Sequence, residues 1–391
     1  MTDGAPRQLT RTATGPQRAD LLELFFDLAF IASLTLTSQA MAAEQTWTGI
    51  AQALLALSTL WAVWVTTTLI TDTYSPRKRP IPQLILGIMF GIMLMSAALP
   101  TAFHEHGLIF GGTWAAINLG RGLVLIRSLR GREGQERSLR ALVWNLGSGT
   151  LWVVGGLVAD PEWRLAVWLV ALGVDYVAFG FRFPIPGRAP LPQYRVAPEH
   201  LAERYQQIYI LTLGELVLVS VLSLSHQPFT PDRIAAFATA FLTAAVLWWS
   251  YAQGAGATLR AAIEASPHRT RLVQTNPYAH WLMVAAVVGT AAGVERIIAQ
   301  PWERPTAPMA ALVLGGAGLF LIGRAVLEHE VYGRVPLSHV VGVVATIALA
   351  PLSVHLPGLA LGLAAALVLL GVAAVEFLRA RHRRAPSPAT L

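Results

Sequence analysis

The chain has 391 residues, of which 54% are hydrophobic and only 13% are charged, and its mean hydropathy is +0.52. This composition excludes a soluble globular protein and indicates a polytopic membrane protein, because the chain is far more apolar than soluble domains are. The 29 Lys and Arg residues outnumber the 22 Asp and Glu residues, but cytoplasmic loops of membrane proteins collect basic residues, so we expect no nucleic-acid partner.

Twelve segments are long and apolar enough to cross a bilayer, which takes about 20 residues of helix. The expected spans are 20–42, 48–71, 81–103, 107–127, 138–158, 163–183, 200–225, 232–254, 272–298, 307–328, 337–355 and 357–379. A polar segment, residues 1–19, precedes them, and we interpret it as a disordered cytoplasmic tail. A basic cytoplasmic tail, residues 380–391, follows them. The longest break, residues 255–271, leaves no room for a separate soluble domain.

The basic residues predict the orientation of these spans. With the amino terminus inside, Lys and Arg fall almost entirely in cytoplasmic loops, and the opposite side has only Arg164, Arg233, Arg296 and Arg304. We therefore predict an all-α, multi-pass protein of the bacterial cytoplasmic membrane, with both termini in the cytoplasm and the lipid bilayer as its partner.

An internal repeat is predicted from two similar segments. Residues 21–30, LLELFFDLAF, resemble residues 201–210, LAERYQQIYI, and each segment is followed one span later by tryptophans. Six spans per half is an even number, so the two halves share one orientation, as in transporters with parallel repeats. We expect repeats over residues 20–183 and 200–379, joined by a cytoplasmic linker at 184–199.

Charged side chains inside the spans are the candidate functional residues, because such groups are costly in lipid and face a partner or a water-filled cavity. Glu23 and Asp27 lie four residues apart on one helix face. The candidates for substrate or ion binding are Glu23, Asp27, Arg121, Asp175, Glu203, Arg204 and Glu215. We expect Arg121 to pair with Asp175 or with a glutamate. The buried cavity that we predict between the halves is lined by Asp27, Arg121, Asp175 and Glu215. The alternative for any one of them is a buried ion pair that fixes helix register.

Other polar and aromatic residues have simpler interpretations. Asp72 and Glu376 lie near helix ends, where we expect them to reach the interface by snorkelling. Tryptophans such as Trp64 are expected to pack or to anchor at interfaces. The chain has no cysteine, and neither an activated nucleophile nor a metal cluster nor a cofactor loop is visible. We therefore expect no metal, no cofactor and no enzymatic activity.

Two blocks of the sequence resemble a known family. Glu23-Leu-Phe-Phe-Asp27-Leu-Ala-Phe30, together with His200-Leu-Ala-Glu203-Arg204 and Leu213-Gly214-Glu215, is similar to the most recognisable blocks of the bacterial low temperature requirement A family. The resemblance covers about residues 18–380 and implies an integral membrane protein of poorly defined molecular activity. Ala29 and Ala32-Ser33 stand where that family commonly has other residues, which affects local packing.

Three functions remain open at this point. The first is a secondary transporter, with or without proton coupling, that binds an unknown small molecule or ion through intramembrane carboxylates. The second is a channel whose pore is lined by the same acids. The third is a non-transporting membrane protein of cold or envelope adaptation. The two repeats are also similar in arrangement to an endolysosomal potassium channel family, by analogy alone. The major facilitator fold is disfavoured, because the loop at residues 72–79 lacks its glycine and Asp-Arg pattern.

Overall fold

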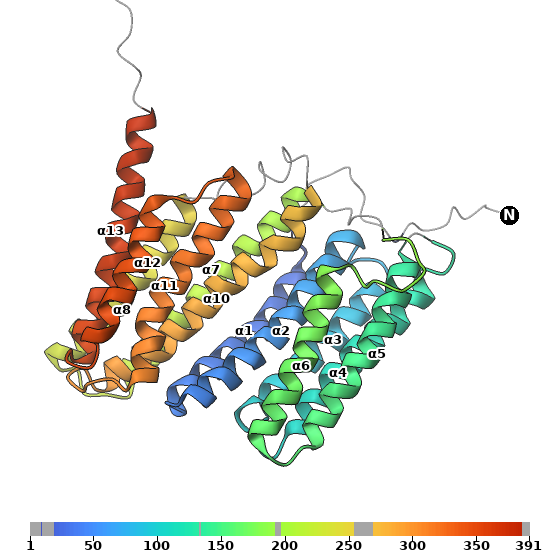
Figure 1. The fold of residues 1–391 in the computed structure, drawn as a ribbon, viewed down its shortest axis with the longest axis horizontal. Helices are drawn as coiled ribbons and strands as arrows, with labels where there is room; N and C mark the ends of the chain where they lie inside the picture. The colour runs from blue at the N-terminus through green and yellow to red at the C-terminus, as the bar shows by residue number, and fades with distance from the viewer. Residues whose placement is uncertain (1–8, 10–18, 133, 192–196, 254–268, 385–391) are drawn as a thin grey trace, which may run out of the picture. The chain divides into compact units, whose positions relative to one another are not determined.

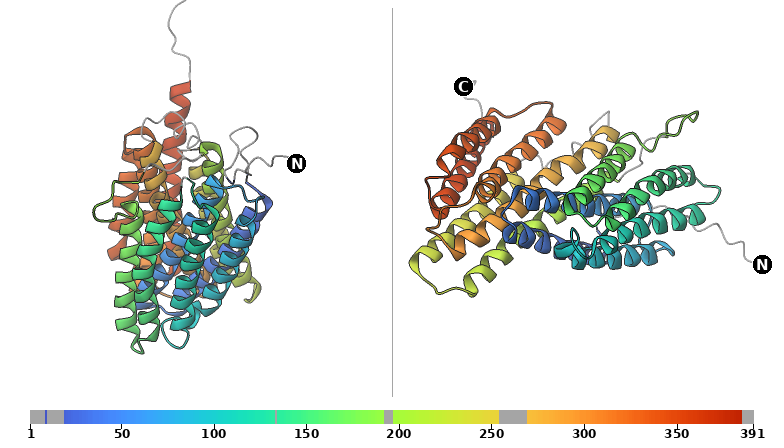
Figure 2. Two further views of the ribbon diagram at one scale, coloured as in Figure 1. Left: turned by 90° about the vertical axis from the view of Figure 1, so that its right-hand side faces the viewer. Right: turned by 60° about the horizontal axis from the view of Figure 1, so that its bottom comes forward.

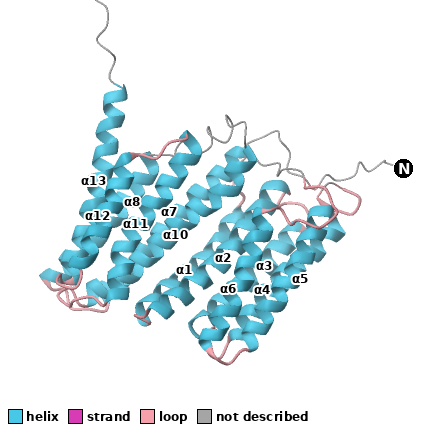
Figure 3. Ribbon diagram, in the orientation of Figure 1, coloured by secondary structure: helices cyan, strands magenta, loops and turns pink. Residues whose placement is uncertain are grey.

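The computed structural model describes residues 9, 19–132, 134–191, 197–253 and 269–384. These residues form twelve α-helices and two short 3-10 turns, and they contain no β-strand (Figures 1 and 3). The chain divides into two compact units, Met1–Ala40 with Ala51–Arg204, and Met41–Ile50 with Tyr205–Leu391. The predicted amino-terminal tail, apart from residues 9 and 19, and most of the predicted loop at 255–271 lie outside the described residues.

The first unit is built mainly from the first six helices. They are α1 (Leu21–Ala43), α2 (Trp47–Thr73), α3 (Ile81–Ala98), α4 (Gly107–Ser128), α5 (Gln135–Leu157) and α6 (Pro161–Gly180). Helices α3 to α6 pack side by side in chain order (Figure 2). The first two turns of α7 (Pro198–Ser225) also belong to this unit, which ends at Arg204.

The second unit contains the rest of α7 and five further helices. They are α8 (Pro231–Gln253), α10 (Arg269–Ala299), α11 (Ala307–Tyr332), α12 (Leu337–Leu349) and α13 (Gly358–Arg384). Helix α11 packs against α10, α12 and α13, and α13 also packs against α8. Helix α13 continues to residue 384, so the first part of the predicted basic tail is helical.

Each predicted span contains one of these helices. Ten of the described helices are long and apolar enough to cross a membrane, and α12 is a shorter apolar helix. Helix α5 is not among the ten, because its first two turns carry Glu136, Arg137 and Arg140. The protein is therefore a multi-pass membrane protein, while the symmetry of two six-helix repeats and the cytoplasmic position of both termini stay predictions.

Local sequence sets the ends of several helices. Asp160 caps α6, since its Oδ1 accepts hydrogen bonds from the backbone N–H groups of Glu162 and Trp163 at 2.9 Å each, and Pro161 takes the first helical position. Thr306 caps α11 in the same way through the N–H of Met309. Gly333 ends α11 with a left-handed backbone conformation, φ 69°, which glycine adopts without strain.

Buried Arg164 holds one end of the first unit together. Its guanidinium donates hydrogen bonds to the carbonyls of Ala102 and His104, both at 2.8 Å, and to those of Gly155 and Val158 at the end of α5. Carbonyls at helix ends have no partner within the helix, so one cation satisfies four acceptors here. The sequence places Arg164 only among the basic residues of the non-cytoplasmic side and predicts no such role.

Candidate functional site

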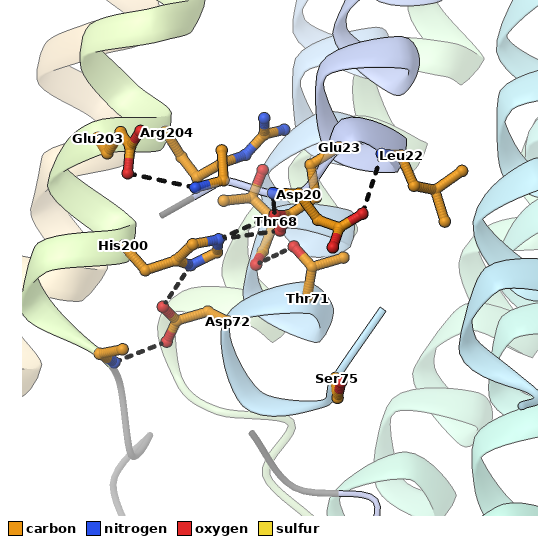
Figure 4. Close-up of polar contacts among 12 residues, drawn as sticks. Asp20, Leu22, Glu23, Thr68, Thr71, Asp72, Ser75, His200, Glu203 and Arg204 are labelled. Carbon is orange, nitrogen blue, oxygen red and sulfur yellow. Dashed lines mark hydrogen bonds and ion pairs between the residues drawn. The ribbon is translucent and has the colours of Figure 1, made fainter. Parts of the chain in front are cut away.

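Two oppositely charged pairs meet in the first unit, between α1 and the start of α7. Glu23 and Asp27 lie one helical turn apart on α1. His200 and Arg204, which Figure 4 labels, have the same spacing on α7. Glu23 contacts His200, and Asp27 contacts Arg204. The equal spacing lets both contacts form at once, so the two helices run in the same direction along this face.

His200 is bridged by carboxylates at both ring nitrogens. Its Nε2 lies 2.9 Å from Oε1 of Glu23, and its Nδ1 lies 2.9 Å from Oδ1 of Asp72 at the end of α2. The exposed fractions of Glu23, Asp72 and His200 are 1%, 3% and 0%. The three side chains therefore form one buried chain of acid, imidazole and acid, which we name the Glu23–His200–Asp72 link.

Proton counting restricts the states of this link. Each of its two nitrogen–oxygen contacts needs one hydrogen, whereas ionised carboxylates only accept and a neutral imidazole donates through one nitrogen. Two protons must therefore be shared among the three groups, and the link then carries a net charge of about −1. Removal of one proton leaves one contact with two acceptors and no donor, so protonation decides whether both contacts persist.

Both oxygens of the Asp27 carboxylate accept hydrogen bonds. Its carboxylate accepts two hydrogen bonds from Arg204 at 2.6 Å each, in a fork-on-fork pair, and a third from Trp64 Nε1 at 2.8 Å. The Arg204 guanidinium also lies 5.7 Å from the centre of the Trp64 ring. Among the described residues, Arg204 Nε has no acceptor. Trp64 in turn stacks on Trp61 at 4.9 Å, which fixes the indole.

Helix termini further stabilise the acids at this end of the unit. Asp72 Oδ2 accepts a hydrogen bond from the N–H of Ala197 at 3.0 Å, just before α7 begins. Glu23 Oε2 accepts one from the N–H of Asp20 at 2.7 Å, just before α1 begins. Both carboxylates thus lie at the positive ends of helices, where negative charge is favoured. Outside the helices, Asp20 pairs with exposed Arg77 at 2.8 Å.

The other predicted residues are not members of the Glu23–His200–Asp72 link. Glu203 is half-buried and accepts a hydrogen bond from the N–H of Ala19 at 3.2 Å. Arg121 donates hydrogen bonds to Thr66 and Asn118.

Asp175 accepts a hydrogen bond from Trp152 Nε1 at 2.9 Å and interacts with Arg121 through charge. Glu215 is buried in the second unit, where it interacts electrostatically with Glu295. The predicted convergence of Asp27, Arg121 and Asp175 with Glu215 stays a prediction.

The structure corrects one interpretation made from the sequence, that of Asp72, and adds a second role to Trp64, whose expected packing it confirms. Asp72 does not snorkel to the interface, because its carboxylate is bound to His200 inside the unit. Trp64 does more than pack, since it donates a hydrogen bond to Asp27. His200 itself was quoted only as part of a motif. The available signal was the i, i+4 spacing of His200 and Arg204, which matches the spacing of Glu23 and Asp27.

A second buried ion cluster lies in the second unit, where the sequence predicts only that Glu376 reaches the interface. Arg324 of α11 is fully buried, with Nη2 3.4 Å from Glu328 and 3.8 Å from Glu376 of α13. Glu376 also lies 3.1 Å from His339 Nε2 of α12, so it does not simply reach for the interface. Within the described part of the chain, Arg324 Nε and Nη1 have no acceptor.

Ten apolar helices of membrane-spanning length, with a buried network of acids, histidine and arginine between them, define a polytopic membrane protein. A family profile described as bacterial low temperature requirement A protein (LtrA) matches residues 18–374. The chain therefore belongs to this family, which confirms the resemblance of the Glu23 and His200 blocks. An uncharacterized protein of Rhizobium meliloti (strain 1021) is 30% identical over 98% of this chain and 95% of its own length. No solved structure matches the chain.

Proposed function

We propose that the protein is a proton-coupled secondary transporter of the cytoplasmic membrane, in which the Glu23–His200–Asp72 link holds the exchangeable proton. The observation that carries the proposal is the double bridging of one fully buried histidine by two buried carboxylates. Histidine exchanges protons near physiological pH, and intramembrane chains of Asp, Glu and His are typical of proton relays.

The two contacts between α1 and α7, Glu23 with His200 and Asp27 with Arg204, have different roles in this mechanism. Asp27 and Arg204 form a doubly hydrogen-bonded ion pair that keeps α1 in contact with α7 in every state. The link beside it loses one of its two hydrogen bonds when a proton leaves. Loss of that bond releases the start of α7 from Glu23 or from Asp72, while the ion pair one turn away acts as the pivot.

Helix α7 extends from this link into the second unit, where it carries Glu215. A rearrangement at the start of α7 is therefore passed along a continuous helix. In transporters with repeated halves, such movements alternate the exposure of a central substrate site. The proposal assigns no catalytic step to the protein, and the transported solute is a small molecule or an ion.

The test is flux into liposomes that contain the purified full-length protein. A panel of inorganic ions and small metabolites is presented with and without an imposed pH gradient, while a trapped dye reports internal pH. We expect at least one solute to accumulate only with the gradient, with saturable uptake and counterflow. Glu23→Gln keeps the side-chain shape, and His200→Gln replaces the ring by a polar side chain that does not titrate; both should abolish gradient-driven accumulation.

Matched controls are Glu162→Gln and His226→Gln, which change exposed residues away from the link. Both should transport normally. Monodisperse elution and unchanged thermal unfolding show that each variant is folded. Non-saturable conductance would instead indicate a channel, and unaltered coupled flux in folded Glu23→Gln and His200→Gln proteins would overturn the proposal.

A further inference from the structure

A groove of about 640 Å³ runs along the outer face of the α3–α4 hairpin in the first unit. The short connection at residues 99–106 makes the two helices antiparallel neighbours, so the start of α3 lies beside the end of α4. The walls are apolar and face outward, with Phe90 67% exposed and Leu108 47% exposed. In a membrane protein, such a surface faces lipid.

Three glycines keep this groove open. Gly87 of α3 and Gly120 of α4 line it, and a Cβ added at either would meet no described atom within 4 Å. A Cβ at Gly112, which also lines it, would meet only the Leu108 side chain of its own helix at 3.9 Å.

These positions differ from the glycines that pack helices together in the same hairpin. A Cβ at Gly91 would meet Ile117 at 2.6 Å, and one at Gly111 would collide with the carbonyl of Trp152. Glycine inside a helix is less favourable than alanine by about 1 kcal/mol. Close packing explains Gly111 and also Gly91, the fourth glycine that lines the groove, whereas Gly87, Gly112 and Gly120 have no packing reason and leave the groove open.

The charged side chains at the groove are cationic, and they lie at one end of it. Arg121 is its only charged lining residue, and no acid lies among the lining residues, all of which are described. The Arg121 guanidinium is buried and already donates to Thr66 and Asn118, so exposed Arg79 supplies the accessible cation. Arg121 lies toward the end of the hairpin where α3 begins. Exposed Arg79 lies at the same end, next to the lining residue Pro80. An elongated apolar groove with cations at one end complements an amphiphile with an anionic head and an extended chain.

We propose that this groove binds an anionic phospholipid, with one acyl chain along Gly87 and Gly112 and the headgroup phosphate at the end that carries Arg79 and Arg121. A second copy of the chain is disfavoured, because a twofold contact through this face would bring the arginines of both copies together.

The test measures which lipid stays bound to the full-length protein. The protein is mixed with equal amounts of phosphatidylglycerol and phosphatidylcholine in detergent, delipidated in steps, and examined by native mass spectrometry. We expect retained phosphatidylglycerol in excess over phosphatidylcholine. Gly112→Leu and Gly87→Leu place a leucine side chain in the groove at positions where an added Cβ meets no described atom nearer than 3.9 Å, and they should lower retention about tenfold, as expected for the loss of about two buried methylenes.

Two further variants separate the binding of the acyl chain in the groove from the recognition of the headgroup. Gly173→Leu places the same side chain at an exposed, open helix position on α6 outside the groove, and retention should be unchanged. Arg79→Gln should remove the preference for phosphatidylglycerol while the mass of chain-bound lipid persists. Equal retention in Gly112→Leu and the parent protein would overturn the proposal, as would a parent dimer that Gly112→Leu converts to a monomer.

Discussion

The pair formed by Asp27 and Arg204 allows a quantitative test of the charge network. Asp27→Asn keeps the shape of the side chain but removes the charge that balances a guanidinium only 1% exposed. Removal of one partner from a buried ion pair leaves an uncompensated charge and destabilises proteins by about 3–5 kcal/mol. Asparagine still accepts one hydrogen bond, so we expect a loss toward the lower end of this range.

A double-mutant cycle isolates this interaction. Asp27→Asn, Arg204→Met and the double variant are unfolded by heat and by denaturant in the same detergent. We expect each single change to destabilise strongly and the double change to destabilise much less than the sum, because it leaves no unpaired charge. If Asp27→Asn were as stable as the parent protein, or if the two effects simply added, the assignment of this pair as the fixed contact between α1 and α7 would fail.

Three other predictions concern Trp64, Arg164 and Arg132. Trp64→Phe keeps the ring stacked on Trp61 but removes a hydrogen bond to a carboxylate, and should reduce unfolding free energy by about 1.5–3 kcal/mol. Arg164→Leu leaves four backbone carbonyls without their donor and should lower the thermal unfolding temperature more than Arg233→Leu, which removes one contact to a carbonyl. A cysteine at exposed Arg132, in a chain with no other cysteine, should react with an impermeant reagent only after the cells are opened. Labelling of intact cells would reverse the predicted orientation.

The helices were predictable because each apolar run of membrane-spanning length is bounded by Pro, Gly or charged residues. The breaks at residues 75–80 and 301–305 end helices for this local reason. The acids Glu23 and Asp27 were found by the same kind of signal, because charge inside an apolar run is unusual. Local sequence pattern thus identified the helices and the two acids of α1 in the charge network.

The partners of those acids were not predictable from local pattern. His200 and Asp72 lie 128 residues apart in sequence, and each is close to a helix end, where a polar side chain needs no special explanation. Only the packing of the start of α7 beside α1 and α2 gives these residues their role. The contact between Arg324 and Glu376 was missed for the same reason, since the packing of α11 against α13 brings them together.

The central claim is that the Glu23–His200–Asp72 link gains and loses a proton. Nitrogen NMR of protein labelled with ¹⁵N-histidine in lipid nanodiscs tests it most directly, with His200→Gln identifying the signals of His200 by difference. The account predicts two protonated ring nitrogens in the fully bonded link and a reversible change to one protonated nitrogen as pH rises while the protein stays folded. Ring signals of His200 that stay unchanged over the whole folded pH range would contradict the account.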